Sequence, residues 1–156
     1  MWISNELSLR KQISAVLLVI ASAAIVALSL AVSAHAATDA DTVLGRWRFT
    51  AALDAADIAS LDEREAAALI GKVFTISRQR VMFGSRDCGA PELEIERVEP
   101  DEYLREQAHA SGENLGLPNP VTVVDLGCTI AFIKGKNRLV IFWKGWFFDA
   151  TRLKGR

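Results

Sequence analysis

Apolar and polar residues in the last third of the chain alternate with the two-residue period of β-strands. Three runs show this alternation, over residues 121–133, 137–143 and 146–153. Glycine permits a two-residue hairpin turn at Lys144-Gly145. Such a turn predicts three opposed pairs on one wholly apolar face, which are Trp143 with Trp146, Ile141 with Phe148, and Leu139 with Ala150.

A turn near Gly135-Lys136 extends this apolar face to a third strand. The pairs that it predicts are Phe132 opposite Leu139, Ile130 opposite Ile141, and Cys128 near Trp143. The apolar face then continues over three strands without a break, so the register is self-consistent. We therefore expect Trp143, Trp146 and Phe148 to line the interior of the domain.

The opposite face of the last hairpin is mixed. It holds Phe142 and Phe147, which are candidate partner-binding residues, beside Arg138, Asp149 and Thr151. Two interpretations of the two phenylalanines stay open. Either a helix or loop covers them, or they form an exposed contact patch for a partner.

Helix signals are few in the rest of the chain. Asp62 with Glu65, or Ser60 with Glu63, fits an N-terminal capping pair, and Gly71 suits the end of the helix that would follow. The other predicted elements are strands over residues 43–51, on both sides of 77–79 and over 92–98, a short helix after Pro100, and a loop over 111–120. About eight short strands with hairpin-like spacing indicate a mainly β fold, a small antiparallel barrel or sandwich with one or two short helices.

The N-terminus has the pattern of a secretory signal. Arg10 and Lys11 precede an uncharged stretch over residues 12–34, and Ala34-His35-Ala36 follows as a cleavage site of small residues. We expect residues 1–36 to be a signal peptide and residues 37–156 to be the exported domain, periplasmic or secreted. The alternative is an uncleaved anchor, because the stretch nearly suffices to span a bilayer. Membrane contact is expected only through this segment.

Net charge gives no reason to expect nucleic acid as a partner. Without the signal segment, 16 Lys and Arg residues stand against 18 Asp and Glu residues. The distribution is uneven, however. Residues 87–113 contain nine acids and two bases, whereas residues 134–156 contain seven bases and one acid. An acidic side and a basic side would steer a charged partner.

The exported domain has two cysteines, Cys88 and Cys128. In an oxidising compartment an even pair favours a disulfide over two free thiols. A metal pair or a redox site lacks support, because the chain has neither C-x-x-C spacing nor nearby histidines. We therefore predict a structural disulfide.

Catalytic chemistry is not indicated. The exported domain has one histidine, His109, and Ser111 lies too close along the chain to form the usual triad with it. No metal-ligand spacing and no glycine-rich phosphate loop are present, so we expect no enzymatic activity and no cofactor. Glu92, Glu94 and Glu96 form a comb of carboxylates. The comb is either a solvated strand face or a docking site for a cationic partner or a divalent ion.

Gly45-Arg46-Trp47 on the first strand resembles the G-x-W signature of lipocalins and the wider calycin group. In that group an Arg late in the chain packs over the Trp, and Arg152 lies in the corresponding place. The resemblance implies a small lipocalin-like barrel that is closed by Gly45, Trp47 and Arg152. A guanidinium stacked on an indole suits that role.

Trp143-Lys144-Gly145 resembles, one residue shorter, the Trp-x-Lys-Gly motif that ends the periplasmic C-type lysozyme inhibitors. The Ser-Gly-x-x-Tyr element of that family is absent, and the corresponding residues 134–139 read KGKNRL. If the binding mode carries over, the resemblance implies that Lys144 is the cation that reaches the partner.

These observations predict an exported, non-enzymatic binding protein of the cell envelope. Its best-motivated form is an inhibitor or immunity protein against a cell-wall-degrading enzyme, because the compact domain carries an acidic segment that would steer to a cationic hydrolase. The alternative is a carrier of a small apolar ligand within the barrel, although aromatic side chains are expected to fill an interior of this size. A structural role in the envelope is a third possibility.

Overall fold

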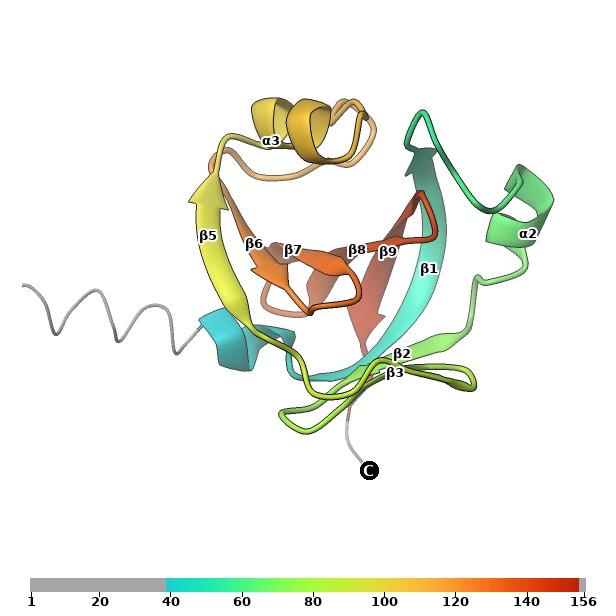
Figure 1. Cartoon of the computed structure of the whole chain (residues 1–156), viewed down its shortest axis with the longest axis vertical. Coiled ribbons are helices and arrows are strands. Elements are labelled where there is room, and N and C mark those ends of the chain that lie inside the picture. Colours follow the sequence, from blue (N-terminus) through green and yellow to red (C-terminus); the bar gives the residue numbers. More distant parts are fainter. Residues whose placement is uncertain (1–38, 155–156) are drawn as a thin grey trace, which may run out of the picture. The chain divides into compact units, whose positions relative to one another are not determined.

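Nine antiparallel strands form one curled sheet, a half-barrel, in the computed structural model, which describes residues 39–154 (Figure 1). Their order is β4-β3-β2-β1-β9-β8-β7-β6-β5. The strands are β1 (Gly45–Ala55), β2 (Val73–Ile76), β3 (Val81–Phe83), β4 (Arg86–Asp87), β5 (Glu94–Val98), β6 (Val121–Asp125), β7 (Ile130–Gly135), β8 (Arg138–Trp143) and β9 (Trp146–Arg152). The helices are α2 (Glu63–Ala67) and α3 (Pro100–Gln107), and residues 39–43 are also helical. The predicted signal segment, residues 1–36, lies outside the described residues.

The sheet curls far enough for distant strands to touch through their side chains. Phe83 of β3 and Trp143 of β8 are separated by three strands in the sheet, yet their ring centroids are 5.3 Å apart. The side chains between these strands form an inner core, which includes Trp47, Phe49, Phe74, Ile141 and Phe148. The mainly β fold expected from the alternation is therefore confirmed.

A second cluster, the outer core, lies on the other face of β6 to β9. Val123, Phe132, Val140 and Phe147 of the sheet pack there against Leu104, Ala108 and Leu115 from α3 and the loop that follows it. Strands β6 to β9 are thus buried on both faces, which explains their nearly continuous apolar sequences. The aromatic run at residues 142–148 is a wall between two cores.

The register predicted across Lys144-Gly145 is confirmed. Trp143 pairs with Trp146, and all of the predicted pairs follow down to Leu139 with Ala150. The register predicted between β7 and β8 is wrong by one residue. Ile133, not Phe132, lies opposite Leu139, and Ala131, not Ile130, lies opposite Ile141.

The turn lies one residue later than predicted, which moves the pairing by two residues, and a bulge moves it back by one. The pairing jumps from Ile133 to Gly135, so that Lys134 is the extra residue, and the turn lies at 136–137. Because strand side chains alternate, the one-residue shift sends Phe132 to the outer core. The predicted strand over 121–133 is in fact the β6–β7 hairpin.

The predicted capping pair of the first helix is the one between Asp62 and Glu65. The Asp62 carboxylate accepts from the Glu65 backbone N–H at 2.8 Å, and the Glu65 carboxylate accepts from the Asp62 N–H at 2.9 Å. Gly71, with φ +86°, follows the helix and turns the chain into β2. The second predicted helix, α3, begins at Pro100.

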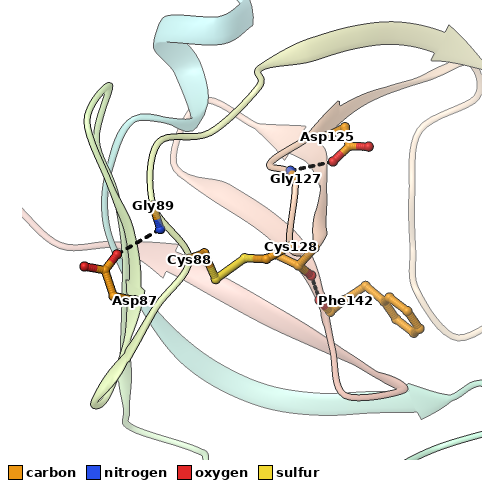
Figure 2. The surroundings of a disulfide bond; sticks show 8 residues. Asp87, Cys88, Gly89, Asp125, Gly127, Cys128 and Phe142 are labelled. Atoms are coloured by element: carbon orange, nitrogen blue, oxygen red, sulfur yellow. Dashed lines mark hydrogen bonds between the residues drawn. A yellow bond between two sulfur atoms is a disulfide. The ribbon is translucent and has the colours of Figure 1, made fainter.

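The disulfide joins the β4 end of the open sheet to the β6–β7 turn, next to the other edge strand, β5 (Figure 2). Cys88 follows the edge strand β4, and Cys128 lies in the turn between β6 and β7, 40 residues further along. Their Cα atoms are 6.0 Å apart. Since β4 and β5 are not hydrogen-bonded neighbours, the covalent bond spans the seam that the strand ladder leaves open. Both cores and the disulfide lie within the compact unit that begins at Asp39, so we expect this unit to fold by itself.

Candidate binding surfaces

Arg152 stacks on Trp47 at one end of the β1–β9 ladder. Its guanidinium carbon lies 4.3 Å from the centre of the Trp47 ring, directly across the β1–β9 ladder. The guanidinium also donates to the carbonyl oxygens of Leu44, at 2.6 Å, and of Thr42. Burial lowers the pKa of this guanidinium. The stack on Trp47 and the hydrogen bonds to Leu44 and Thr42 together hold the end of the helical residues 39–43 against the sheet.

Glycine is required at position 45 for two reasons. Its φ of +141° is rare for residues with a side chain, and a Cβ atom would come within 2.7 Å of the Arg152 guanidinium. The triplet Gly45-Arg46-Trp47 is therefore a steric and stacking unit with Arg152. The indole N–H of Trp47 completes it by donating to the Val43 carbonyl at 2.7 Å.

Phe142 and Phe147 belong to the outer core. Their centroids lie 4.7 Å apart, and Phe147 is fully buried, whereas Phe142 is half-buried. Residues of α3 and of the loop after it cover this part of the sheet. The interpretation as an exposed patch is therefore wrong for Phe147, because a partner cannot reach its ring.

The carboxylate comb is interrupted. Leu93 has a left-handed backbone (φ 56°), and β5 begins only at Glu94, so the regular alternation does not extend back to Glu92. Glu94 and Glu96 instead join acids from α3 and β6 around Tyr103. We call this set the acidic groove, and its acids are Glu94, Glu96, Glu99, Glu102, Glu106 and Asp125.

The acidic groove is a concave surface. Its larger part has a volume of about 550 Å³ between α3 and the strands β5 and β6. Tyr103 stands at the centre, because it lines both parts of the groove together with Glu96 and Asp125. Burial raises the pKa of Tyr103 to about 12, and the charges of Glu96 and Asp125 add to this shift. The hydroxyl therefore stays a donor at any physiological pH.

The carboxylates of the acidic groove are not neutralised by neighbours. The ion pairs among residues 39–154 join Arg78 to Asp41, Arg80 to Asp87, and both Lys134 and Arg138 to Asp149. The groove acids meet neutral donors instead. Glu99 caps α3 by accepting from the Glu102 N–H at 2.7 Å, and Asp125 accepts from the Gly127 N–H at 2.6 Å (Figure 2).

Lys144 lies at the tip of the β8–β9 hairpin and is exposed. Its backbone is left-handed (φ 52°), and its carbonyl accepts from the Ser60 N–H at 3.0 Å. A Cβ atom on Gly145 would come within 2.4 Å of Ala59, so only glycine permits this close approach. The contacts with residues 56–60 hold the backbone of the hairpin tip in a fixed position.

A charged network that sequence reasoning missed lies beside the outer core. Asp149 is 7% exposed and pairs with Arg138 at 2.6 Å and with Lys134 at 3.3 Å. Lys134 also donates to the Leu115 carbonyl at 2.7 Å, which ties the loop to the sheet. The available signal was the single acid within the apolar run of β9. The network is structural, since every charge in it has a partner.

His109 and Ser111 lie in the loop after α3, beside Asp57, Asp101 and Arg105. His109 is exposed, and its N–H and ring show no hydrogen bond to Ser111 that would activate a nucleophile. The Ser111 hydroxyl instead accepts from the Glu113 N–H at 3.3 Å. No group of three or more His, Cys, Asp or Glu residues within 39–154 is placed to hold a metal ion.

Comparisons with protein-family models, with curated proteins and with solved structures find no match for this chain. The fold is therefore defined by its own strand order and register, as a curled antiparallel half-barrel. In the part of the chain that the structure describes, no helix has the length and apolar character needed to cross a membrane.

Proposed function

We propose that this domain is an exported, non-enzymatic binding protein of the cell envelope that docks a cationic protein on the acidic groove. The observation that carries the proposal is the gathering of six carboxylates in one concave surface without an ion pair among the described residues. The partner class that fits best is a cell-wall-degrading hydrolase with a basic surface, which the domain would inhibit. The disulfide supports export, because such bonds persist in oxidising compartments.

The groove is suited to recognition because its walls are fixed. Leu104 of α3 is fully buried in the outer core, and Pro100 and the Glu99 cap set the start of the helix. A fixed set of like charges attracts a cationic partner over a distance and raises the association rate. Lys and Arg side chains of the partner would replace the missing counter-charges.

The lipocalin-like interpretation is part of the proposal. It is supported by the stacked Arg152 on Trp47 and by the steric need for Gly45. A carrier function inside the barrel has less support, because aromatic rings occupy the inner core. Phe49 stacks on Phe148 at 4.5 Å, and Phe74 lies 5.5 Å from both Phe83 and Trp143.

The test is a search for the partner with residues 37–156, followed by charge reversal in the groove. Immobilised oxidised protein is mixed with envelope extract, and bound proteins are identified by mass spectrometry. We expect a cationic cell-wall hydrolase, which the protein inhibits at stoichiometric concentration in a lysis assay. The variant Glu94→Lys/Glu106→Lys should weaken this binding about tenfold or more, and added salt should weaken binding to the native protein.

The matched control is Glu63→Lys/Glu92→Lys. It changes the net charge by the same amount at exposed acids outside the groove. Equal loss of binding in both variants would show that net charge, and not the groove, attracts the partner. Absence of any captured hydrolase and of any effect on lysis would refute the inhibitor proposal.

A further inference from the structure

A second surface, at the end of the half-barrel away from Arg152, has the opposite charge. It is a cleft of about 580 Å³ between the segments that flank the helix α2, the β3–β4 turn and the tip of the β8–β9 hairpin. We call it the mouth cleft. Its size is that of an ordinary small-molecule site. Its lining includes three apolar residues and three cations, which are Leu69, Phe83, Trp143, Lys72, Arg86 and Lys144.

The floor of the mouth cleft is apolar and rigid. Trp143 and Phe83 belong to the inner core, where Phe74 packs edge-on against Trp143 at 5.5 Å. Leu69 adds a half-buried aliphatic wall. Trp143 is 6% and Phe83 9% exposed, so a ligand would meet only the edges of these rings, and the half-buried Leu61 and Leu69 would add apolar contact.

The rim of the mouth cleft is cationic. Lys72, Arg86 and Lys144 are exposed, and none of them forms an ion pair within residues 39–154. The guanidinium of Arg86 lies over the Trp143 ring at 5.8 Å, so one cation stands directly above the apolar floor. The lining residues include no acid. The rim therefore lacks a counter-charge, and an anion would supply it.

We infer that the mouth cleft binds an anionic amphiphile, a molecule with an apolar chain or ring that lies on Trp143 and Phe83 and one carboxylate or phosphate that meets Lys72, Arg86 and Lys144. This chemistry occurs in free fatty acids and in anionic phospholipids. The site is separate from the acidic groove and does not depend on the function proposed above. It also differs from a carrier cavity, because the ligand lies on the core and not inside it.

The test uses residues 37–156 and four probes, which are dodecanoate, uncharged dodecanol, inorganic phosphate, and vesicles of phosphatidylglycerol in phosphatidylcholine. Binding is followed by calorimetry and by the fluorescence of tryptophan. We expect saturable binding of dodecanoate below its micelle concentration, with dodecanol and inorganic phosphate each at least about tenfold weaker. Equal affinity for dodecanol, or no saturable binding of dodecanoate, would overturn the inference.

The vesicles distinguish the two sources of the ligand. Binding to dodecanoate alone identifies a free fatty acid, whereas additional binding to anionic vesicles identifies a phospholipid. Binding to vesicles without binding to dodecanoate would contradict a pocket for single molecules and overturn the inference.

Matched variants locate the site. Lys72→Gln/Lys144→Gln should weaken dodecanoate binding about tenfold, whereas Arg46→Gln/Arg48→Gln, exposed on β1 outside the cleft, should leave it unchanged. The groove variant Glu94→Lys/Glu106→Lys should also leave it unchanged, which separates this inference from the proposed function. Equal weakening in the cleft and β1 variants would place the ligand elsewhere.

Discussion

The inner and outer cores lie on the two faces of the same strands, β6 to β9, but different elements enclose them. The sheet encloses the inner core by curling on itself, so Phe83 of β3 reaches Trp143 of β8. The outer core is enclosed by α3 and the loop after it, which contribute Leu104, Ala108 and Leu115. The inner core therefore depends on the whole barrel, and the outer core depends on one added segment.

This difference assigns separate tasks to the two faces. Loss of a side chain from the inner core affects contacts between strands that are far apart in the sheet, so it weakens the entire fold. The outer core fixes the cover that carries much of the acidic groove, including Glu102 and Glu106. Alternation along β8 and β9 allows one hairpin to serve both tasks, because Phe148 faces inward and Phe147 faces outward.

The largest effect is expected from Phe148→Ala. Phe148 is fully buried and stacks on Phe49, and its removal leaves a cavity at the centre of the inner core. We expect a loss of about 3–5 kcal/mol in the free energy of unfolding, measured by urea denaturation. Phe142→Ala, at a half-buried position on the other face of β8, is the control and should cost clearly less. Equal losses would contradict the greater dependence of the fold on the inner core.

A somewhat smaller effect is expected from Cys88→Ser/Cys128→Ser. The disulfide closes a loop of 40 residues, for which chain entropy predicts about 3–4 kcal/mol. Reduction of the native protein should lower its melting temperature by about as much as the double substitution does. An unchanged melting temperature would show that strand packing alone holds the seam.

The smallest effect concerns Tyr103, on the helix α3 that covers the outer core. Tyr103 is the only tyrosine in the chain, so the ultraviolet absorbance of tyrosinate reports its ionisation directly. We expect a pKa of about 12 in the folded protein and a return toward the ordinary value of 10.0 after unfolding. Because folding raises this pKa, the protonated hydroxyl adds stability below pH 10.0, and that stability is lost as the pH rises toward 12.

Glu96→Gln removes one of the causes of the shift, so it should lower the pKa of Tyr103 without returning it to 10.0, since burial is the largest cause. Glu92→Gln is the control, because Glu92 lies outside the groove. A larger change in the control than in Glu96→Gln would show that the acidic groove is assigned to the wrong residues.

Local sequence signals predicted those parts of the fold that depend on local geometry. The β8–β9 register follows from one glycine turn and strict alternation, and the cap of α2 follows from Asp62 and Glu65. The β7–β8 register failed because the turn lies at 136–137, one residue later than expected, and because nothing in the sequence marks Lys134 as a bulge. The short edge strand β4, with only two residues, has no readable period.

The candidate sites were predictable to a lesser degree. The stack of Arg152 on Trp47 was expected from the resemblance of Gly45-Arg46-Trp47 to the G-x-W signature, because local patterns do not show that β1 and β9 are neighbours. The comb was only partly right, since the left-handed Leu93 separates Glu92 from Glu94 and Glu96. The mouth cleft joins residues that flank α2 with residues of β2, β3, β4 and β8, and such an assembly becomes visible only when the sheet curls.

The seam-spanning disulfide also decides how mechanical load would pass through the domain. Strand β1 begins beside the end of β9, so a pull on the two flanking chain ends would separate this antiparallel pair one hydrogen bond after another. Once the strands separate, tension would cross directly from Cys88 to Cys128 through the sulfur atoms. The segment between them, with β5, α3 and β6, would carry none of it. The acidic groove lies entirely on that unloaded segment, so a partner bound there would be shielded from this tension.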